Sequence, residues 1–339
     1  MKLRLAQIAA VAAGVAASAG FAGDGAASSA AGARIFPPDI KVVGVVMPAS
    51  ILAKDTFDRG IEMLKSTGVR VKIARRIRFD KVAPLEDRVA DFEDAWMDPE
   101  VDLVLCARGG TGSENVITRL DWARLRTRPD QRVLGFSNIT MILNAMLRER
   151  AGHPFSGPSL GALLKSSGDT KEWTARAIAG DPQPAAQLRP LRAGSFSGLP
   201  CGGHIALVRL GINMKWNADA AGRVVFLERN NSASAPRIRR ELEDIVASGY
   251  LDKAAGVIFG DVTPGAVEPE GKKGGGARKL SGAELRAARA EVESAKRDFA
   301  AKVKCPVYDG YAYGHVPVSH AIDFRRRVSV DENGVMTWE

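Results

Sequence analysis

Cysteine and histidine are scarce in this chain of 339 residues, which contains 3 Cys and 4 His. Cys106, Cys201 and Cys305 stand far apart and form no C-x-x-C pair, which excludes zinc-finger, thioredoxin-like and disulfide-rich classes. Cys201 and His204 lie three residues apart, but no second pair of ligands accompanies them. The sequence therefore predicts neither a metal nor another cofactor.

Long apolar runs are also absent, apart from one at the N-terminus. Lys2 and Arg4 precede an apolar stretch at residues 5–15, and small residues follow it. This order is typical of a secretory signal peptide, so residues 1–30 are expected to be a signal peptide and leader, cleaved after Ala19 or Ala22. We expect an exported, periplasmic protein with no membrane span after leader removal. An Ala-rich leader on a cytoplasmic protein is the alternative.

Charge of one sign is in modest excess, with a formal net charge of +9. This value alone does not choose among nucleic acid, an anionic envelope surface and an acidic substrate. Residues 281–302 have apolar residues at helical spacing and basic residues on the other face, but acidic residues are interspersed and aromatic residues that stack on bases are missing. No nucleic-acid partner is expected.

The remaining composition, with 45% apolar and 26% charged residues, is that of a globular protein of about two domains. β-Branched runs alternate with segments of helical spacing, which predicts an open parallel sheet in an N-terminal α/β domain at 38–167. The predicted strands are 41–47, 69–73, 101–106 and 133–136, and the predicted helices are 57–66, 85–96, 116–125 and 139–150.

The second half of the chain is predicted to be a separate α/β domain. Residues 168–199 are rich in Pro, Gly and Ala and are expected to be a linker, followed by a C-terminal α/β domain at 200–339. Its expected elements are strands at 224–227 and 256–259 and helices at 236–248 and 281–302. The polar stretch 264–276 is expected to be a surface loop.

Two turns of the first domain are candidates for catalysis. Ser137 follows a strand and precedes a helix, a position that exposes a nucleophilic hydroxyl, although a helix cap is the commoner role of such a serine. The loop Arg108-Gly-Gly-Thr-Gly follows another strand. Its glycines can present backbone N–H groups as an oxyanion hole, although a plain tight turn is equally consistent.

The second half offers a carboxylate and an imidazole. Glu228 ends the strand at 224–227, and His315 lies in a loop rich in Gly and Tyr. Sites tend to lie in such loops, which favours His315 as a general base over the other histidines.

As a set, these segments resemble the LD-carboxypeptidase family of serine peptidases, from Val42 to about Arg327. The motifs that carry the resemblance are Asp102 to Ser113, Gly135-Phe-Ser-Asn-Ile-Thr, Ser156-Gly-Pro, Gly202-Gly-His, Phe226-Leu-Glu and Gly314-His315. The resemblance implies an N-terminal open sheet similar to class I glutamine amidotransferases and a smaller C-terminal α/β domain. It also implies an enzyme that often forms homodimers and needs no metal.

The same resemblance implies a Ser-His-Glu triad. Ser137 would be the nucleophile, His315 the general base and Glu228 the group that orients the imidazole. The backbone N–H groups of Gly110 and Asn138 would bind the oxyanion.

This sequence departs from the family pattern around the expected site. Thr111 replaces an aromatic residue, Asn138 replaces an acidic one beside the nucleophile, and Arg229 replaces the acidic residue after the triad Glu. The changes at Asn138 and Arg229 make the expected cleft less negative, which favours anionic murein peptides. Thr111 and Arg229 are expected to join Gly110 and Asn138 in binding the oxyanion and the substrate.

The leading hypothesis is therefore a serine carboxypeptidase that removes a terminal D-amino acid from murein peptides. Two alternatives stay open: a related amide or acyl-peptide hydrolase that inactivates a peptide antibiotic, and a non-catalytic peptide-binding protein of the cell envelope.

Overall fold

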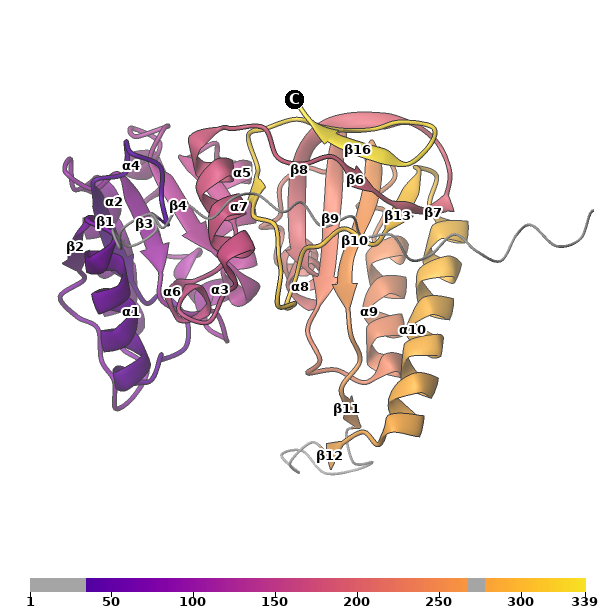
Figure 1. The fold of residues 1–339 in the computed structure, drawn as a ribbon, viewed down its shortest axis with the longest axis horizontal. Helices are drawn as coiled ribbons and strands as arrows, with labels where there is room; N and C mark the ends of the chain where they lie inside the picture. Colours follow the sequence, from indigo (N-terminus) through magenta and orange to yellow (C-terminus); the bar gives the residue numbers. More distant parts are fainter. Residues whose placement is uncertain (1–34, 268–277) are drawn as a thin grey trace, which may run out of the picture. The chain divides into compact units, whose positions relative to one another are not determined.

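The computed structural model describes residues 35–267 and 278–339. The expected signal peptide at 1–30 and most of the expected surface loop at 264–276 lie outside the described residues. The described part contains two large sheets with helices packed against them (Figure 1), so the mixed α/β class is confirmed.

The first sheet has six strands in the order β14-β5-β4-β3-β1-β2. Five parallel strands come from the N-terminal half: β1 (Val42–Val46), β2 (Arg70–Ile73), β3 (Leu103–Cys106), β4 (Arg132–Gly135) and β5 (His153–Ser156). β1 and β3 are buried along their whole length, as expected where helices cover both faces of a parallel sheet. The sixth strand, β14 (Ile322–Asp323), pairs antiparallel with β5, so the sheet is not purely parallel.

Helices follow most of these strands. Their bounds are α1 (Lys54–Ser66), α2 (Leu85–Met97), α3 (Ser113–Val116), α4 (Trp122–Leu125), the 3-10 turn η1 (Ser137–Ile139), α5 (Thr140–Glu149) and α6 (Leu160–Leu163). The single helix predicted at 116–125 is wrong, because α3 ends at Val116 and α4 begins at Trp122. Asp121 accepts a hydrogen bond from the N–H of Arg124 at 3.0 Å, and such a cap starts a new helix.

Residues 168–199 are not an open linker. They contain α7 (Gly168–Ala179), β6 (Ala186–Gln187), β7 (Arg189–Arg192) and the start of β8 (Phe196–His204). Ser167 caps α7 by accepting a hydrogen bond from the N–H of Thr170. Proline and glycine here separate short elements, and the exact domain boundaries stay a prediction.

The second sheet has eight strands in the order β6-β16-β15-β8-β9-β10-β13-β7, more than the first, although the resemblance implied the smaller unit here. Four of its strands run parallel: β8, β9 (Arg223–Arg229), β10 (Gly256–Val262) and β13 (Val307–Asp309). β7, β15 (Val328–Val330), β16 (Val335–Trp338) and β6 pair antiparallel at its two sides. A separate small hairpin joins β11 (Ala266–Val267) to β12 (Arg278–Lys279).

Three helices accompany this sheet: α8 (Ile205–Met214), α9 (Ala235–Ala247) and α10 (Gly282–Lys302). α9 and α10 lie side by side (Figure 1), and Ser281 and Glu284 form a capping box at the start of α10. No helix within the described ranges is long and apolar enough to cross a membrane.

The hydrophobic core connects the two sheets. One buried cluster contains Ile142 of α5 together with Phe226 of β9 and Trp338 of β16. Because buried side chains of both halves pack in one cluster, this common core fixes the carboxyl end of β4 relative to the carboxyl end of β9. The candidate catalytic residues lie at these strand ends.

Candidate active site

Ser137 lies on a strained turn between β4 and α5. Its φ angle is +62°, in the left-handed region that non-glycine residues rarely adopt. Such a backbone conformation costs about 1–3 kcal/mol, and residues that adopt it are concentrated at functional sites. A Cβ on Gly135 would lie 2.6 Å from Cγ2 of Ile139, so the turn requires glycine there. The strand-turn-helix geometry expected for a nucleophilic serine is therefore present, with Ile139 in place of a second glycine.

The glycine-rich loop after β3 packs directly against this turn. A Cβ on Gly109 would lie 2.8 Å from the Cβ of Ser137, and Gly110 has φ +103°. Ser50 fixes the loop, since its Oγ accepts a hydrogen bond from the N–H of Thr111 at 3.0 Å. Gly110 and Thr111 are exposed beside the serine turn, where the sequence placed an oxyanion and substrate site.

Asn138 joins the two turns through its side chain. Its Oδ1 accepts a hydrogen bond from the N–H of Ser113 at 2.9 Å, and its Nδ2 donates to Oε2 of Glu114 at 3.2 Å. The residue is 2% exposed. The amide is therefore used to hold the glycine-rich loop, while any contact with substrate falls to the backbone.

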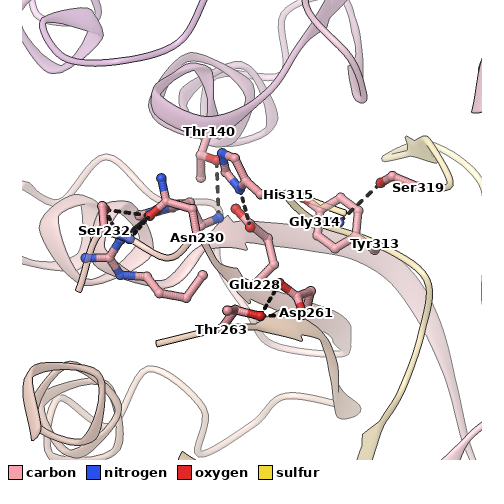
Figure 2. Close-up of polar contacts among 12 residues, drawn as sticks. Thr140, Glu228, Asn230, Ser232, Asp261, Thr263, Tyr313, Gly314, His315 and Ser319 are labelled. Atoms are coloured by element: carbon pink, nitrogen blue, oxygen red, sulfur yellow. Dashed lines mark hydrogen bonds and ion pairs between the residues drawn. The ribbon is translucent and has the colours of Figure 1, made fainter. Parts of the chain in front are cut away.

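Glu228 and His315 are hydrogen-bonded to each other. Nδ1 of His315 lies 2.8 Å from Oε2 of Glu228, and Figure 2 shows this contact above Asp261 and Thr263. Glu228 is completely buried, and its Oε1 has no hydrogen-bond partner in the described part of the chain. Burial raises the pKa of Glu228, an effect that the hydrogen bond from His315 partly offsets.

A glycine lets the His315 loop approach this carboxylate. Gly314 has φ +130°, and a Cβ there would lie 3.2 Å from the Cβ of Glu228. Its N–H donates to Oγ of Ser319 at 3.2 Å, and the carbonyl of Tyr313 accepts from the N–H of Asp261 at 2.8 Å. The loop is thus fixed on both sides of His315.

The His315 ring also contacts the turn that carries Ser137. Its centroid lies 4.6 Å from that of Phe136, the residue before Ser137, and its side chain is 28% exposed. Within the described residues no hydrogen bond joins Ser137 to His315. Catalytic hydrogen bonds are often long until substrate binds, so the arrangement is compatible with a serine-histidine pair.

Arg229 does not give the cleft the free positive charge expected from the sequence. The residue is 3% exposed, and its Nε donates to Oε2 of Glu241 at 2.9 Å. The same guanidinium contacts Asn230 at 2.7 Å and Ser232 at 3.1 Å. The expectation fails because Arg229 is buried in the protein and paired with Glu241 of α9, which also pairs with Arg237.

His204 is a residue of the site that sequence reasoning did not select. Its Nε2 lies 3.1 Å from a guanidinium nitrogen of Arg229, and its Nδ1 is buried without a partner in the described part. Burial, reinforced by Arg229, lowers the pKa of His204 to about 3, so the ring is neutral. Its centroid lies 6.0 Å from that of His315. The signal in the sequence was its place directly after Gly202-Gly203 at a strand end.

The candidate active site shows no cluster of metal-binding side chains among the described residues. The described residues contain no group of three or more His, Cys, Asp or Glu side chains arranged to hold a metal ion.

Comparison with known proteins identifies the family. The model of the LD-carboxypeptidase N-terminal domain matches residues 43–157, and that of the C-terminal domain matches residues 197–330. The chain belongs to the LD-carboxypeptidase family. The expected enzyme class, a carboxypeptidase, is confirmed with it.

Individual relatives agree with this assignment. A Streptomyces coelicolor protein named as a carboxypeptidase is 29% identical over 229 residues, 64% of this chain and 74% of the relative. A Bacillus subtilis protein named as a murein peptide carboxypeptidase is 26% identical over 232 residues, 65% and 71% of the two chains. The Escherichia coli microcin C7 self-immunity protein is 26% identical over 125 residues, 36% and 35% of the two chains.

Solved structures share the fold. The muramoyltetrapeptide carboxypeptidase of Oxalobacter formigenes has a TM-score of 0.70 at 20% sequence identity, covering 88% of this chain and 97% of that one.

Proposed function

We propose that this LD-carboxypeptidase family member hydrolyses the L,D-peptide bond to a terminal D-amino acid in murein peptides, using Ser137, His315 and Glu228 as a triad. The hydrogen bond from Nδ1 of His315 to Glu228 carries the proposal. Because Nδ1 is engaged, Nε2 is the ring nitrogen left to accept the proton of Ser137. The strained, half-buried turn of Ser137 directly after β4 supports its assignment as the nucleophile.

The proposed reaction has two halves. Oγ of Ser137 attacks the scissile carbonyl carbon while Nε2 of His315 takes its proton, and the N–H groups of Gly110 and Asn138 stabilise the oxyanion. His315 then protonates the leaving amine, which departs as the D-amino acid. Water then attacks the acyl carbon with His315 as base, the bond between that carbon and Oγ of Ser137 breaks to release the shortened peptide, and His315 returns the proton to Oγ.

The substrate class rests on the relatives. The Bacillus subtilis relative and the Oxalobacter formigenes structure are named for murein and muramoyl peptides. We also propose that the first sheet is similar to that of class I glutamine amidotransferases. We further propose that the protein is a homodimer, and sedimentation of the mature protein tests this.

The decisive measurement is mass spectrometry of purified murein tetrapeptide incubated with the mature protein. We expect release of D-Ala, reduced by about three or more orders of magnitude in Ser137→Ala and His315→Ala. Glu228→Gln is expected to cost less than either. Ser66→Ala, which removes an exposed hydroxyl at the end of α1, is the matched control. Near-normal turnover by Ser137→Ala would contradict the triad.

Export is the second part of the proposal. The expected signal peptide predicts that mature protein from its native host begins between Gly20 and Ser28. N-terminal sequencing checks this, and an intact Met1 in the cytosolic fraction would favour the cytoplasmic alternative.

Inactivation of a peptide antibiotic is the second candidate, supported by the microcin immunity relative. Hydrolysis of aspartyl sulfamoyl adenosine, with no release of D-Ala from the tetrapeptide, would favour it. The binding-protein alternative predicts no turnover of either compound. It also predicts no difference between the mature protein and Ser137→Ala in labelling by a fluorophosphonate.

A further inference from the structure

A cavity lies at the carboxyl ends of β10 and β13, next to the loop that carries His315. Its volume is about 470 Å³, and its walls come from β10, α10 and the segment that follows β13. Ser137, Glu228 and His315 are not among its lining residues. Parallel sheets commonly bind ligands beyond the carboxyl ends of their strands, and sites for small molecules have volumes of roughly 300–1,000 Å³.

Three of the charged groups in this cavity, together with Arg189 beside it, neutralise one another. Nζ of Lys296 lies 2.8 Å from Oδ2 of Asp309, and Lys296 also pairs with Glu293. Arg189 pairs with both carboxylates. Lys296 and Asp309 are each 5% exposed, so they form a buried polar floor that has no charge left for a ligand.

Two charges of opposite sign remain without an ionic partner among the described residues. Asp261 receives hydrogen bonds from the hydroxyl of Thr263 at 2.9 Å but pairs with no cation. Arg289 of α10 is exposed and has no hydrogen bond or ion pair in the described part of the chain. Apolar side chains complete the walls: Val262, Val292, Tyr311, Val316 and Val318.

From this arrangement we infer that the cavity is a binding site for a small zwitterion, an amino acid or dipeptide with aliphatic side chains. The ligand's ammonium group would pair with Asp261, its carboxylate with Arg289, and its aliphatic part would cover the valines. Charge-assisted hydrogen bonds to both ends supply the orientation, and burial of the aliphatic part supplies affinity.

The test measures binding without turnover, so it does not depend on which bond the enzyme cleaves. Calorimetric titration of Ser137→Ala with D-alanine, L-leucine and L-alanyl-L-alanine is expected to show saturable binding of at least one of them. Arg289→Gln and Asp261→Asn, each made in that background, are expected to weaken it by about tenfold or more. Arg286→Gln is the matched control, because Arg286 is exposed on the same helix but does not line the cavity.

Analogues with one charge complete the experiment. Propionate lacks the ammonium group of D-alanine, and ethylamine lacks its carboxylate. Each is therefore expected to bind more weakly than D-alanine, by a factor of about ten or more. The inference is overturned if none of the three zwitterions binds at about 10 mM, a very weak limit. It is also overturned if Arg289→Gln leaves their affinity unchanged, or if propionate binds as tightly as alanine.

Discussion

At the scale of single residues, Arg229 shows how a substitution next to a catalytic residue can be structural. Its guanidinium and the carboxylate of Glu241 are each 4% exposed as side chains. Breaking a buried pair leaves one charge uncompensated, at a cost of roughly 3–5 kcal/mol. The position after Glu228 therefore serves the framework of the site.

We accordingly expect Arg229→Glu to destabilise the protein by about 3–5 kcal/mol, because it places two carboxylates together in the interior. Urea unfolding measures the change. Arg209→Glu is the control, since Arg209 is 44% exposed beside Asp244, and an exposed pair contributes only about 0–1 kcal/mol. An Arg229→Glu protein of normal stability that discriminates differently between anionic and amidated tetrapeptides would restore the original expectation of a substrate-binding arginine.

Two buried histidines make stability depend on pH. Burial lowers the pKa of His320 to about 4 and that of His204 to about 3, below the unfolded value of about 6.5. The folded state therefore binds fewer protons than the unfolded state, so stability is complete above about pH 6.5 and falls as the pH drops toward these folded values.

The expected contribution of His320 is about 1.4 kcal/mol per pH unit between roughly pH 6 and pH 4.5. Urea unfolding across this range should show a shallower loss of stability in His320→Gln than in the unsubstituted protein. The comparison uses slopes, because the variant also loses ring packing at every pH. Equal slopes would show that His320 does not titrate as its burial implies.

At the scale of elements, α7 holds the loop that carries His315. Trp173 of α7 stacks on His320 with ring centroids 3.7 Å apart and planes 8° apart. The N–H of Ser319 donates to Oγ1 of Thr170 at 3.0 Å. A helix from the expected linker thus positions the candidate base.

Trp173→Ala is therefore expected to lower kcat for tetrapeptide hydrolysis by about tenfold to hundredfold, since small displacements of a catalytic group are costly. Steady-state kinetics checks this. Trp173→Phe, which keeps an aromatic ring for stacking, should retain kcat within about twofold. Similar losses in both variants would mean that the stack does not position the loop.

The sequence predicted elements that are defined by their own residues. The β-branched runs of β1 and β3 and the spaced apolar residues of α10 were recognisable, as were the triad candidates from their motifs. β14 and β6 are two-residue strands that exist through distant partners, and no local pattern marks them. The pairing of Arg229 with Glu241 could not be predicted either, because it depends on how α9 packs beside β9.

At the scale of the whole described part of the chain, each half contributes residues to the sheet or core of the other. β14 comes from the C-terminal stretch but forms the edge of the first sheet, and one core cluster contains side chains from both sheets. The halves share structure that a cut near residue 200 would divide.

We therefore expect residues 35–199 and 200–339, expressed separately, to lack a cooperative unfolding transition, because each exposes part of the common core. Coexpression of the two fragments should restore a folded complex. Circular dichroism and gel filtration measure both outcomes. A fragment that unfolds cooperatively by itself would support the predicted boundary as a true domain boundary.

The position of β14 in the sequence also determines when the first sheet can be completed during synthesis. The five parallel strands of the first sheet are synthesised first, but their last neighbour, β14, is synthesised only after β6 to β13. Until then the free side of β5 is an unpaired strand edge, a surface on which other chains can add. The growing chain must therefore stay protected from aggregation until β14 has been synthesised, so completion of the first sheet waits for most strands of the second.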